Sequence, residues 1–253
     1  MSFFIRSFRI LSLFLWTLLM IAVSLPDRFR GWKGRLHTSV LVSLWARGAA
    51  RITGIKIKTY GKKPAGRAGL VVSNHLGYTD IVVHASIFPL RFTPSTDVAK
   101  IPVVGAVTAT SNPIFVDRKS SQSAKKAARD FAKTMRRGMF LIVYPEGTSS
   151  DGKNGILPFK STPFDAAAGG KMPIFPVLTR YPGSPDRPSV PWYGDMTFFS
   201  HFWGLLGAGS IAAEVLFLDP IEPGDMSRKE LAVHTHKIMS AEWKKWNRGK
   251  RIY

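Results

Sequence analysis

A histidine and an aspartate lie five residues apart in the stretch SNHLGYTDIVV, residues 73–83. On one continuous helix, side chains at this spacing point about 140° apart, because each residue turns roughly 100°. His75 and Asp80 can therefore cooperate only if the backbone bends between them. The carboxylate would then fix the tautomer of the imidazole and leave the other ring nitrogen to act as a general base. The alternative is a helix-capping aspartate beside an unrelated surface histidine.

The residues around this pair predict such a bend. The apolar run GLVVSN indicates a buried strand, and DIVVHASIF indicates a short helix that begins around Thr79. The chain turns between them, from Asn74 to Gly77. His75 is then on the turn, and Asp80 lies in the first helical turn, from which its carboxylate can fold back.

Polar residues also follow a second predicted strand, NPIFVD. This strand ends in Phe115, Asp117 and Arg118, at the strand end where α/β proteins place their sites. An arginine there can hold a phosphate through two parallel hydrogen bonds. The plainer interpretation is a surface salt bridge between Asp117 and its neighbours.

A third predicted strand, MFLIVYPEG, leads into a tight turn. Glu146, Gly147 and Thr148 occupy this turn, whose backbone N–H groups can face an anion. Lys160 follows an aromatic residue in FKSTPF, ahead of the proline-bracketed run MPIFPV. Taken singly, the turn has the plainer interpretation of a loop.

Strands and helices alternate along the chain after Arg51. The segment SSQSAKKAARDFAKTMRRG indicates a helix, MPIFPVLTRY and IAAEVLFLDPI indicate strands, and SRKE is a capping-box pattern that opens a last helix. This alternation favours parallel pairing through right-handed crossovers. We therefore expect an α/β fold, a mostly parallel or mixed sheet flanked by helices, in one domain over residues 52–253.

The composition indicates an anionic partner. The 253 residues carry a net charge of +20 and contain no cysteine, which excludes disulfides, zinc–thiolate sites and a thiol nucleophile. The basic residues gather beside apolar termini and are not interleaved with exposed aromatic residues, so nucleic acid is not expected as a partner. His234 and His236 fit the faces of the last helix, and no metal site is expected.

The first 51 residues are both apolar and basic, with a net charge of +7. Residues 10–25 carry no charge and would make a helix of roughly 24 Å, a little short of the ~30 Å hydrocarbon core. Four interpretations of this segment stay open. It can be a signal peptide, a transmembrane helix, a shallow hairpin with the helical pattern at residues 36–45, or a core helix packed on the domain. We favour membrane attachment, by hairpin or by single span, and expect residues 1–51 to form membrane-binding helices.

Four blocks in this order resemble the glycerolipid acyltransferases of the lysophosphatidate acyltransferase type. That family carries NHxxxxD, a strand ending in FxDR, the block FPEGTRS and a proline-bracketed apolar strand. Here the blocks read NHLGYTD (74–80), IFVDR (114–118), YPEGTSS (144–150) and PIFPV (173–177). The apolar, basic N-terminus is also similar to the two-helix membrane-binding part of bacterial members.

The resemblance implies transfer of a fatty acyl group from a thioester to the free hydroxyl of 1-acylglycerol-3-phosphate, forming phosphatidate. His75 would take the hydroxyl proton and Asp80 would orient the imidazole, without a covalent acyl-enzyme, a metal or a bound cofactor. The implied partners are a lipid bilayer, the lysolipid acceptor, and acyl-CoA or acyl carrier protein. The catalytic domain would face the cytosol at the inner membrane. The implied substrate-binding residues are Asn74, Phe115, Asp117, Arg118, Glu146, Gly147, Thr148 and Lys160.

The chain departs from the family at two cationic positions. Ser149 stands where the family usually has arginine, and Ser95 or Thr96 lies near a position where it usually has lysine. The resemblance assigns both cations to the acceptor's phosphate. Another lysolipid, such as a lysophospholipid or a lyso-ornithine lipid, is therefore the alternative acceptor. A basic membrane-binding protein without catalysis is the alternative from a different class.

Overall fold

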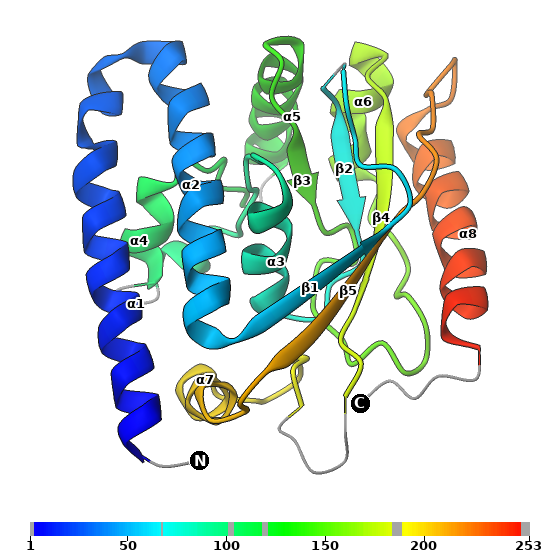
Figure 1. Ribbon diagram of the computed structural model, residues 1–253. Helices are drawn as coiled ribbons and strands as arrows, with labels where there is room; N and C mark the ends of the chain where they lie inside the picture. The colour runs from blue at the N-terminus through cyan, green and yellow to red at the C-terminus, as the bar shows by residue number, and fades with distance from the viewer. Residues whose placement is uncertain (1–2, 67, 101–103, 118–120, 184–188, 249–253) are drawn as a thin grey trace.

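The computed structural model of this chain describes residues 3–66, 68–100, 104–117, 121–183 and 189–248 (Figure 1). Its strands are β1 (Ile55–Tyr60), β2 (Leu70–Ser73), β3 (Leu141–Val143), β4 (Ile174–Arg180) and β5 (Ile211–Phe217). Its α-helices are α1 (Phe3–Ser24), α2 (Gly31–Thr53), α3 (Thr79–Ile87), α4 (Val104–Thr110), α5 (Ser121–Arg136), α6 (Asp165–Gly170), α7 (Phe198–Leu206) and α8 (Arg228–Asn247). Three 3-10 helices connect them: η1 (Leu25–Phe29), η2 (Val98–Lys100) and η3 (Thr162–Phe164).

The five strands form one mixed sheet in the order β1-β5-β4-β2-β3. The central strand β2 is parallel to both β3 and β4, whereas β5 is antiparallel to β4 and parallel to β1. The expected α/β fold with a mostly parallel or mixed sheet is thus confirmed. Because β2, β3 and β4 run the same way, their carboxyl ends lie at one edge of the sheet.

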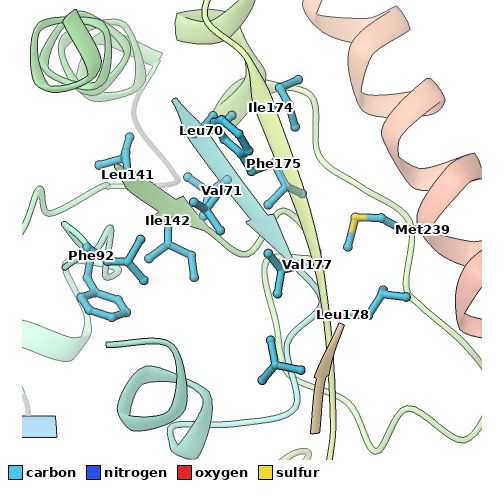
Figure 2. Close-up of a cluster of buried hydrophobic side chains, with 14 of the residues drawn as sticks. Leu70, Val71, Phe92, Leu141, Ile142, Ile174, Phe175, Val177, Leu178 and Met239 are labelled. Carbon is cyan, nitrogen blue, oxygen red and sulfur yellow. The ribbon is translucent and has the colours of Figure 1, made fainter. Parts of the chain in front are cut away.

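The core lies on both faces of these three parallel strands. Every residue of β2, β3 and β4 is buried, as in strands covered by helices on each side. Helix α8 covers the side of the sheet opposite to α2 and α3 (Figure 1). Figure 2 shows how the three strands contribute side chains to this core, together with Phe92 and with Met239 of α8. The strand ends are therefore fixed by dense packing.

The first two helices form an antiparallel hairpin along the side of the domain. Trp16 donates its Nε1–H to the carbonyl of Trp45 at 2.9 Å, and Trp45 donates its own to Thr17 Oγ1 at 3.0 Å. Gly48 makes room for this contact, since a Cβ there would lie 2.3 Å from the indole nitrogen of Trp16. Helix α2 lies between α1 and α3, so α1 is the outermost helix on this side (Figure 1).

Helix α1 is long and apolar enough to cross a membrane, judged by length and composition alone. None of its residues is buried, and large side chains such as Phe4, Phe8 and Phe14 are exposed. Its packing along α2 places this apolar surface on the outside of the hairpin. An apolar face left open in this way is typical of a helix that contacts lipid or another protein.

Several elements differ from the sequence prediction. Strand β1 was not predicted, although IKIKTY alternates apolar and basic residues as a half-exposed edge strand does. The predicted strand NPIFVD is an extended segment outside the sheet. It pairs with residues 92–96 through backbone bonds from Ile114 and Val116, each 2.9 Å long, and one isolated bridge. The predicted capping box of the last helix is confirmed at Ser227 and Glu230.

Candidate active site

The predicted site residues gather at the carboxyl edge of the three parallel strands. His75 lies two residues after β2, Glu146 lies three residues after β3, and Tyr181 follows β4 directly. Open α/β sheets bind their ligands outside this edge. Loops that leave neighbouring strands in the same direction bring residues from distant parts of the sequence together here.

His75 and Asp80 face each other across a bend of the backbone. His75 Nδ1 lies 2.8 Å from Asp80 Oδ2, and the same carboxylate oxygen accepts the backbone N–H groups of Leu76 at 2.7 Å and Gly77 at 3.1 Å. Its other oxygen accepts the hydroxyl of Tyr181 at 2.6 Å. One buried carboxylate therefore holds both the imidazole and the turn that carries it.

The electrostatics of this pair suit a charged aspartate. Burial by itself raises the pKa of the fully buried Asp80 carboxyl, but the hydrogen bond from His75, the positive potential of its imidazole and the hydrogen bond from Tyr181 outweigh it, so the pKa lies below its usual value. The His75 side chain keeps 22% of its surface exposed. A carboxylate on Nδ1 leaves Nε2 as the nitrogen that can accept a proton.

A loop from far along the chain closes over the bend. Trp192 donates its backbone N–H to the carbonyl of Leu76 at 2.7 Å, and Ser149 donates its hydroxyl to the carbonyl of Trp192 at 2.5 Å. Gly77 has φ +151°, and a Cβ there would lie 2.9 Å from the Trp192 nitrogen. Only glycine fits this position without moving the loop.

Asn74 supports the turn from behind. Its amide donates to the carbonyl of Thr179 at 2.9 Å and accepts the N–H of the same residue at 2.8 Å. The side chain is buried, and both of its polar atoms are used. The resemblance implied a substrate contact, whereas the structure places Asn74 in the support of the turn.

Glu146 also braces the turn that carries His75. One carboxylate oxygen accepts the backbone N–H of His75 at 2.8 Å, and the other accepts that of Leu157 at 3.0 Å. Ser150 adds a bond from its N–H to the His75 carbonyl at 3.0 Å. Burial raises the pKa of Glu146 to about 7, although the two backbone hydrogen bonds act in the opposite direction. Glu146 thus fixes the backbone on which the imidazole is mounted.

Behind the pair lies a polar network that the sequence analysis missed. The ring of Tyr144 stacks on His75, and its hydroxyl lies 2.9 Å from Nδ1 of the buried His84. His84 Nε2 lies 2.7 Å from Thr179 Oγ1. Burial lowers the pKa of His84 to about 4, so this imidazole is neutral near pH 7. The only signal for this network in the sequence was the position of His84, one helical turn after Asp80.

A cavity of about 150 Å³ lies next to this site and contains several of the predicted residues. Asp117, Gly147 and Lys160 line it together with Tyr144, and Phe131 of α5 contributes to its apolar wall. Lys160 reaches over the turn, since a Cβ on Gly147 would lie 2.7 Å from its Nζ. A cation and an apolar wall in one cavity suit an amphiphile with a negative group.

The other predicted substrate residues lie elsewhere. Thr148 is exposed on the turn after β3. Phe115 lines a different cavity, beside Arg91 and Asp130, and so does not join the site. Arg118 lies outside the described residues. Within the described part of the chain, no group of three or more His, Asp or Glu side chains could hold a metal ion.

Comparisons with known proteins identify relatives over the part of the chain that forms this site. A family model described as acyltransferase matches residues 54–180, which include the His75 turn, Glu146 and β4. The lyso-ornithine lipid O-acyltransferase of Brucella abortus is 33% identical over 217 residues, covering 80% of this chain and 79% of the relative. The 1-acyl-sn-glycerol-3-phosphate acyltransferase of Neisseria gonorrhoeae is 25% identical, covering 86% and 84%.

A solved structure supports the fold over nearly the whole chain. It is the crystal structure of the 1-acyl-sn-glycerophosphate (LPA) acyltransferase PlsC from Thermotoga maritima, with a TM-score of 0.65 and 20% identity, and the match covers 98% of this chain and 100% of the other. At that identity the likeness concerns the fold. The family match over half of the chain, with the 33% identity to one relative, shows that the chain belongs to the acyltransferase family.

Proposed function

We propose that this chain transfers a fatty acyl group from a thioester to the hydroxyl of a lysolipid. The observation that carries the proposal is the 2.8 Å contact between His75 Nδ1 and the buried carboxylate of Asp80, with the ring partly open to solvent. Membership of the acyltransferase family gives the reaction class. The contact gives the means of activating a hydroxyl.

The geometry supports a direct transfer. His75 Nε2 accepts the proton of the lysolipid hydroxyl as its oxygen attacks the carbonyl carbon of the thioester. The tetrahedral intermediate then expels the thiolate, which receives the proton from the imidazolium. Asp80 stays ionised and stabilises the imidazolium through Nδ1–H. General-base help of this kind is worth roughly 10²–10⁴-fold in rate.

For the acceptor we favour a lyso-ornithine lipid over 1-acylglycerol-3-phosphate. Ser149 replaces the arginine with which the family holds a phosphate, and its hydroxyl is bonded to the Trp192 carbonyl. An ornithine headgroup carries an ammonium beside its carboxylate and is close to neutral, whereas the phosphate of 1-acylglycerol-3-phosphate is an uncompensated anion, so the ornithine headgroup depends less on an added guanidinium. The relative from Brucella abortus is named for this acceptor. This reverses the order of preference that the motifs alone gave.

A second candidate acceptor is 1-acylglycerol-3-phosphate, favoured by one observation. Lys160 places its ammonium over Gly147 in the cavity beside His75, where a phosphate oxygen could lie. A lysine can bind phosphate as a point charge. The relative from Neisseria gonorrhoeae is named for this acceptor.

The charge and the surface of the chain support proposals for the donor and the location. We propose acyl-CoA or acyl carrier protein as donor, because both are anionic thioester carriers and the chain has a net charge of +20. We also propose that the open apolar face of α1 attaches the protein to the cytosolic side of the inner membrane. The basic residues near both ends of α1 suit anionic headgroups, at about 1 kcal/mol each.

Turnover by purified protein on a panel of acceptors tests the proposal. The panel contains a lyso-ornithine lipid, 1-acylglycerol-3-phosphate and a lysophosphatidylethanolamine, each with acyl-CoA and with acyl carrier protein as donor. We expect the highest kcat/KM with the lyso-ornithine lipid. We expect no product from His75→Ala and normal turnover from His234→Ala, which removes an exposed histidine of α8. Absence of product with every acceptor, or turnover in His75→Ala, would contradict the proposal.

A further inference from the structure

Helix α7 packs between the turn that runs from His75 to Asp80 and the hairpin formed by α1 and α2. On one side its aromatic residues surround Tyr78, which lies on the turn between His75 and Asp80. The ring of Tyr78 is 5.0 Å from that of Phe198 and 5.6 Å from that of His201 between centroids. The Tyr78 hydroxyl also lies 2.8 Å from His201 Nδ1. Movement of α7 would therefore move the turn.

On its other side α7 contacts the first turns of α1. The ring of Trp203 lies 5.7 Å from that of Phe3, and the guanidinium of Arg6 lies 5.4 Å from the Trp203 centroid. Arg9 donates two 2.8 Å hydrogen bonds, one to the carbonyl of Leu206 and one to that of Gly209. The first bond satisfies the carbonyl of Leu206, the last residue of α7, which has no partner within the helix, and the second holds the loop that follows α7.

The outer surface of this joint is aromatic, with Arg6 and Arg9 partly exposed beside it. Phe199 is 74% exposed, and it lies one helical turn before Trp203, on the same side of α7. Phe3, Phe4 and Phe8 of α1 are exposed as well. Figure 1 shows α7 beside the N-terminal end of α1. The exposed surface of α7 is therefore continuous with the apolar face of α1.

We propose that α7 is a second membrane-docking element, which inserts Phe199 and Trp203 into the headgroup region of an anionic phospholipid bilayer beside α1. Aromatic rings with adjacent arginines are the side chains that favour this region. Because Tyr78 is bonded to α7, docking of α7 also sets the position of the catalytic turn relative to the lipid surface. The proposal rests on attachment of α1 to the bilayer, as proposed above, and not on the identity of the acceptor.

The absence of cysteine from the chain permits a direct depth measurement, because any introduced cysteine is unique. Nitroxide labels are placed in Phe199→Cys, Phe8→Cys and Val233→Cys. Val233 is the matched control, since it is 69% exposed and belongs to α8, on the far side of the sheet. Accessibility to oxygen and to a water-soluble nickel chelate is measured with and without vesicles of phosphatidylethanolamine and phosphatidylglycerol.

We expect the labels at residues 199 and 8 to gain oxygen accessibility and lose nickel accessibility when vesicles are added, with no change at residue 233. A label at residue 199 that stays in water while the label at residue 8 inserts would overturn the role of α7 and leave attachment by α1 intact. If the label at residue 8 also stays in water, attachment by α1 fails and this proposal fails with it. Spin–spin broadening at residue 199 without vesicles would assign the surface to a second copy of the chain.

A binding measurement provides an independent check. Phe199→Ser should lower the partition coefficient onto the same vesicles about tenfold, because a buried phenyl ring contributes that much or more. Val233→Ser should leave it unchanged, and both variants should keep the unfolding temperature of the parent, since both side chains are exposed. Equal binding by the two variants would contradict the proposal.

Discussion

The ring of Tyr144 lies almost flat against the imidazole of His75, with centroids 4.2 Å apart and planes inclined by 22°. The same tyrosine is bonded through its hydroxyl to His84, which is buried beneath the site. The imidazole of His75 is thus held by the Asp80 carboxylate at Nδ1 and by the Tyr144 ring on its face. These two supports can be removed separately.

Replacement of Tyr144 by phenylalanine removes only the hydroxyl. The stacked ring stays, while Nδ1 of the buried His84 loses its partner. We expect the free energy of unfolding to fall by about 1–3 kcal/mol, the usual cost of an unsatisfied buried polar group. The value of kcat should change little, because the face of His75 stays covered. Urea unfolding and steady-state kinetics measure the two effects. A large loss of kcat at unchanged stability would place the hydroxyl in the chemistry.

Replacement of Asp80 by asparagine tests the charge of the carboxylate. The amide oxygen can still accept the backbone N–H groups of Leu76 and Gly77, so the turn should persist. The imidazolium loses its counter-charge, and kcat should fall by roughly 10²–10⁴-fold. Asp80→Ala should in addition lower the free energy of unfolding, by about 1–3 kcal/mol for each backbone N–H left unpaired. Similar kinetics for parent and Asp80→Asn would argue against the pair as general base.

Replacement of Gly77 by alanine should damage the turn. The backbone there has φ +151°, and the added Cβ would lie 2.9 Å from the Trp192 nitrogen. Gly155→Ala is the matched control, since Gly155 has φ +98° and open space around it. We expect the control to cost about 1 kcal/mol of stability from backbone strain alone. Gly77→Ala should cost more and should also lower kcat. If the two variants lost equal stability, the loop around Trp192 would be able to move away from the added Cβ without cost.

Glu146 should make stability depend on pH. Its pKa of about 7 in the folded chain lies above the usual value of 4.5, so the folded chain binds this proton more tightly than the unfolded chain. The free energy of unfolding should therefore fall as pH rises from about 4.5 to about 7, by roughly 3 kcal/mol in all, and then level off. Glu146→Gln cannot titrate, and the difference in slope between the two proteins isolates this carboxyl. Parallel curves for the two proteins would contradict the assignment.

The sequence predicted the parts of the fold that have a local signal. The parallel strands β2 and β4 begin with the apolar runs LVV and IFPVL, and the last helix begins at a capping box formed by Ser227 and Glu230. The bend between His75 and Asp80 was predictable because helical geometry forbids their contact at this spacing. Helix α7 was not predicted, since its sequence FFSHFWGLL is mostly aromatic and apolar and no helical period was recognised in it.

The residues that hold His75, Asp80 and Asn74 in place could not be predicted from local sequence signals. Tyr181 is 101 residues from the Asp80 that it contacts, and Thr179 is 105 residues from Asn74. No spacing in the sequence links such positions, which the sheet order alone brings together. The role of Glu146 differs from the expected one for a similar reason, because its partner is the backbone N–H of His75 and not a side chain.

The paired bonds between Asn74 and Thr179 bear on any attempt to transplant this site. The amide imitates a peptide unit and continues the ladder between β2 and β4 for one step after β2 has ended. A designer who grafted only the seven-residue motif onto another scaffold would lose that anchorage, since half of it belongs to the adjacent strand. The portable unit is the motif together with its neighbouring parallel strand.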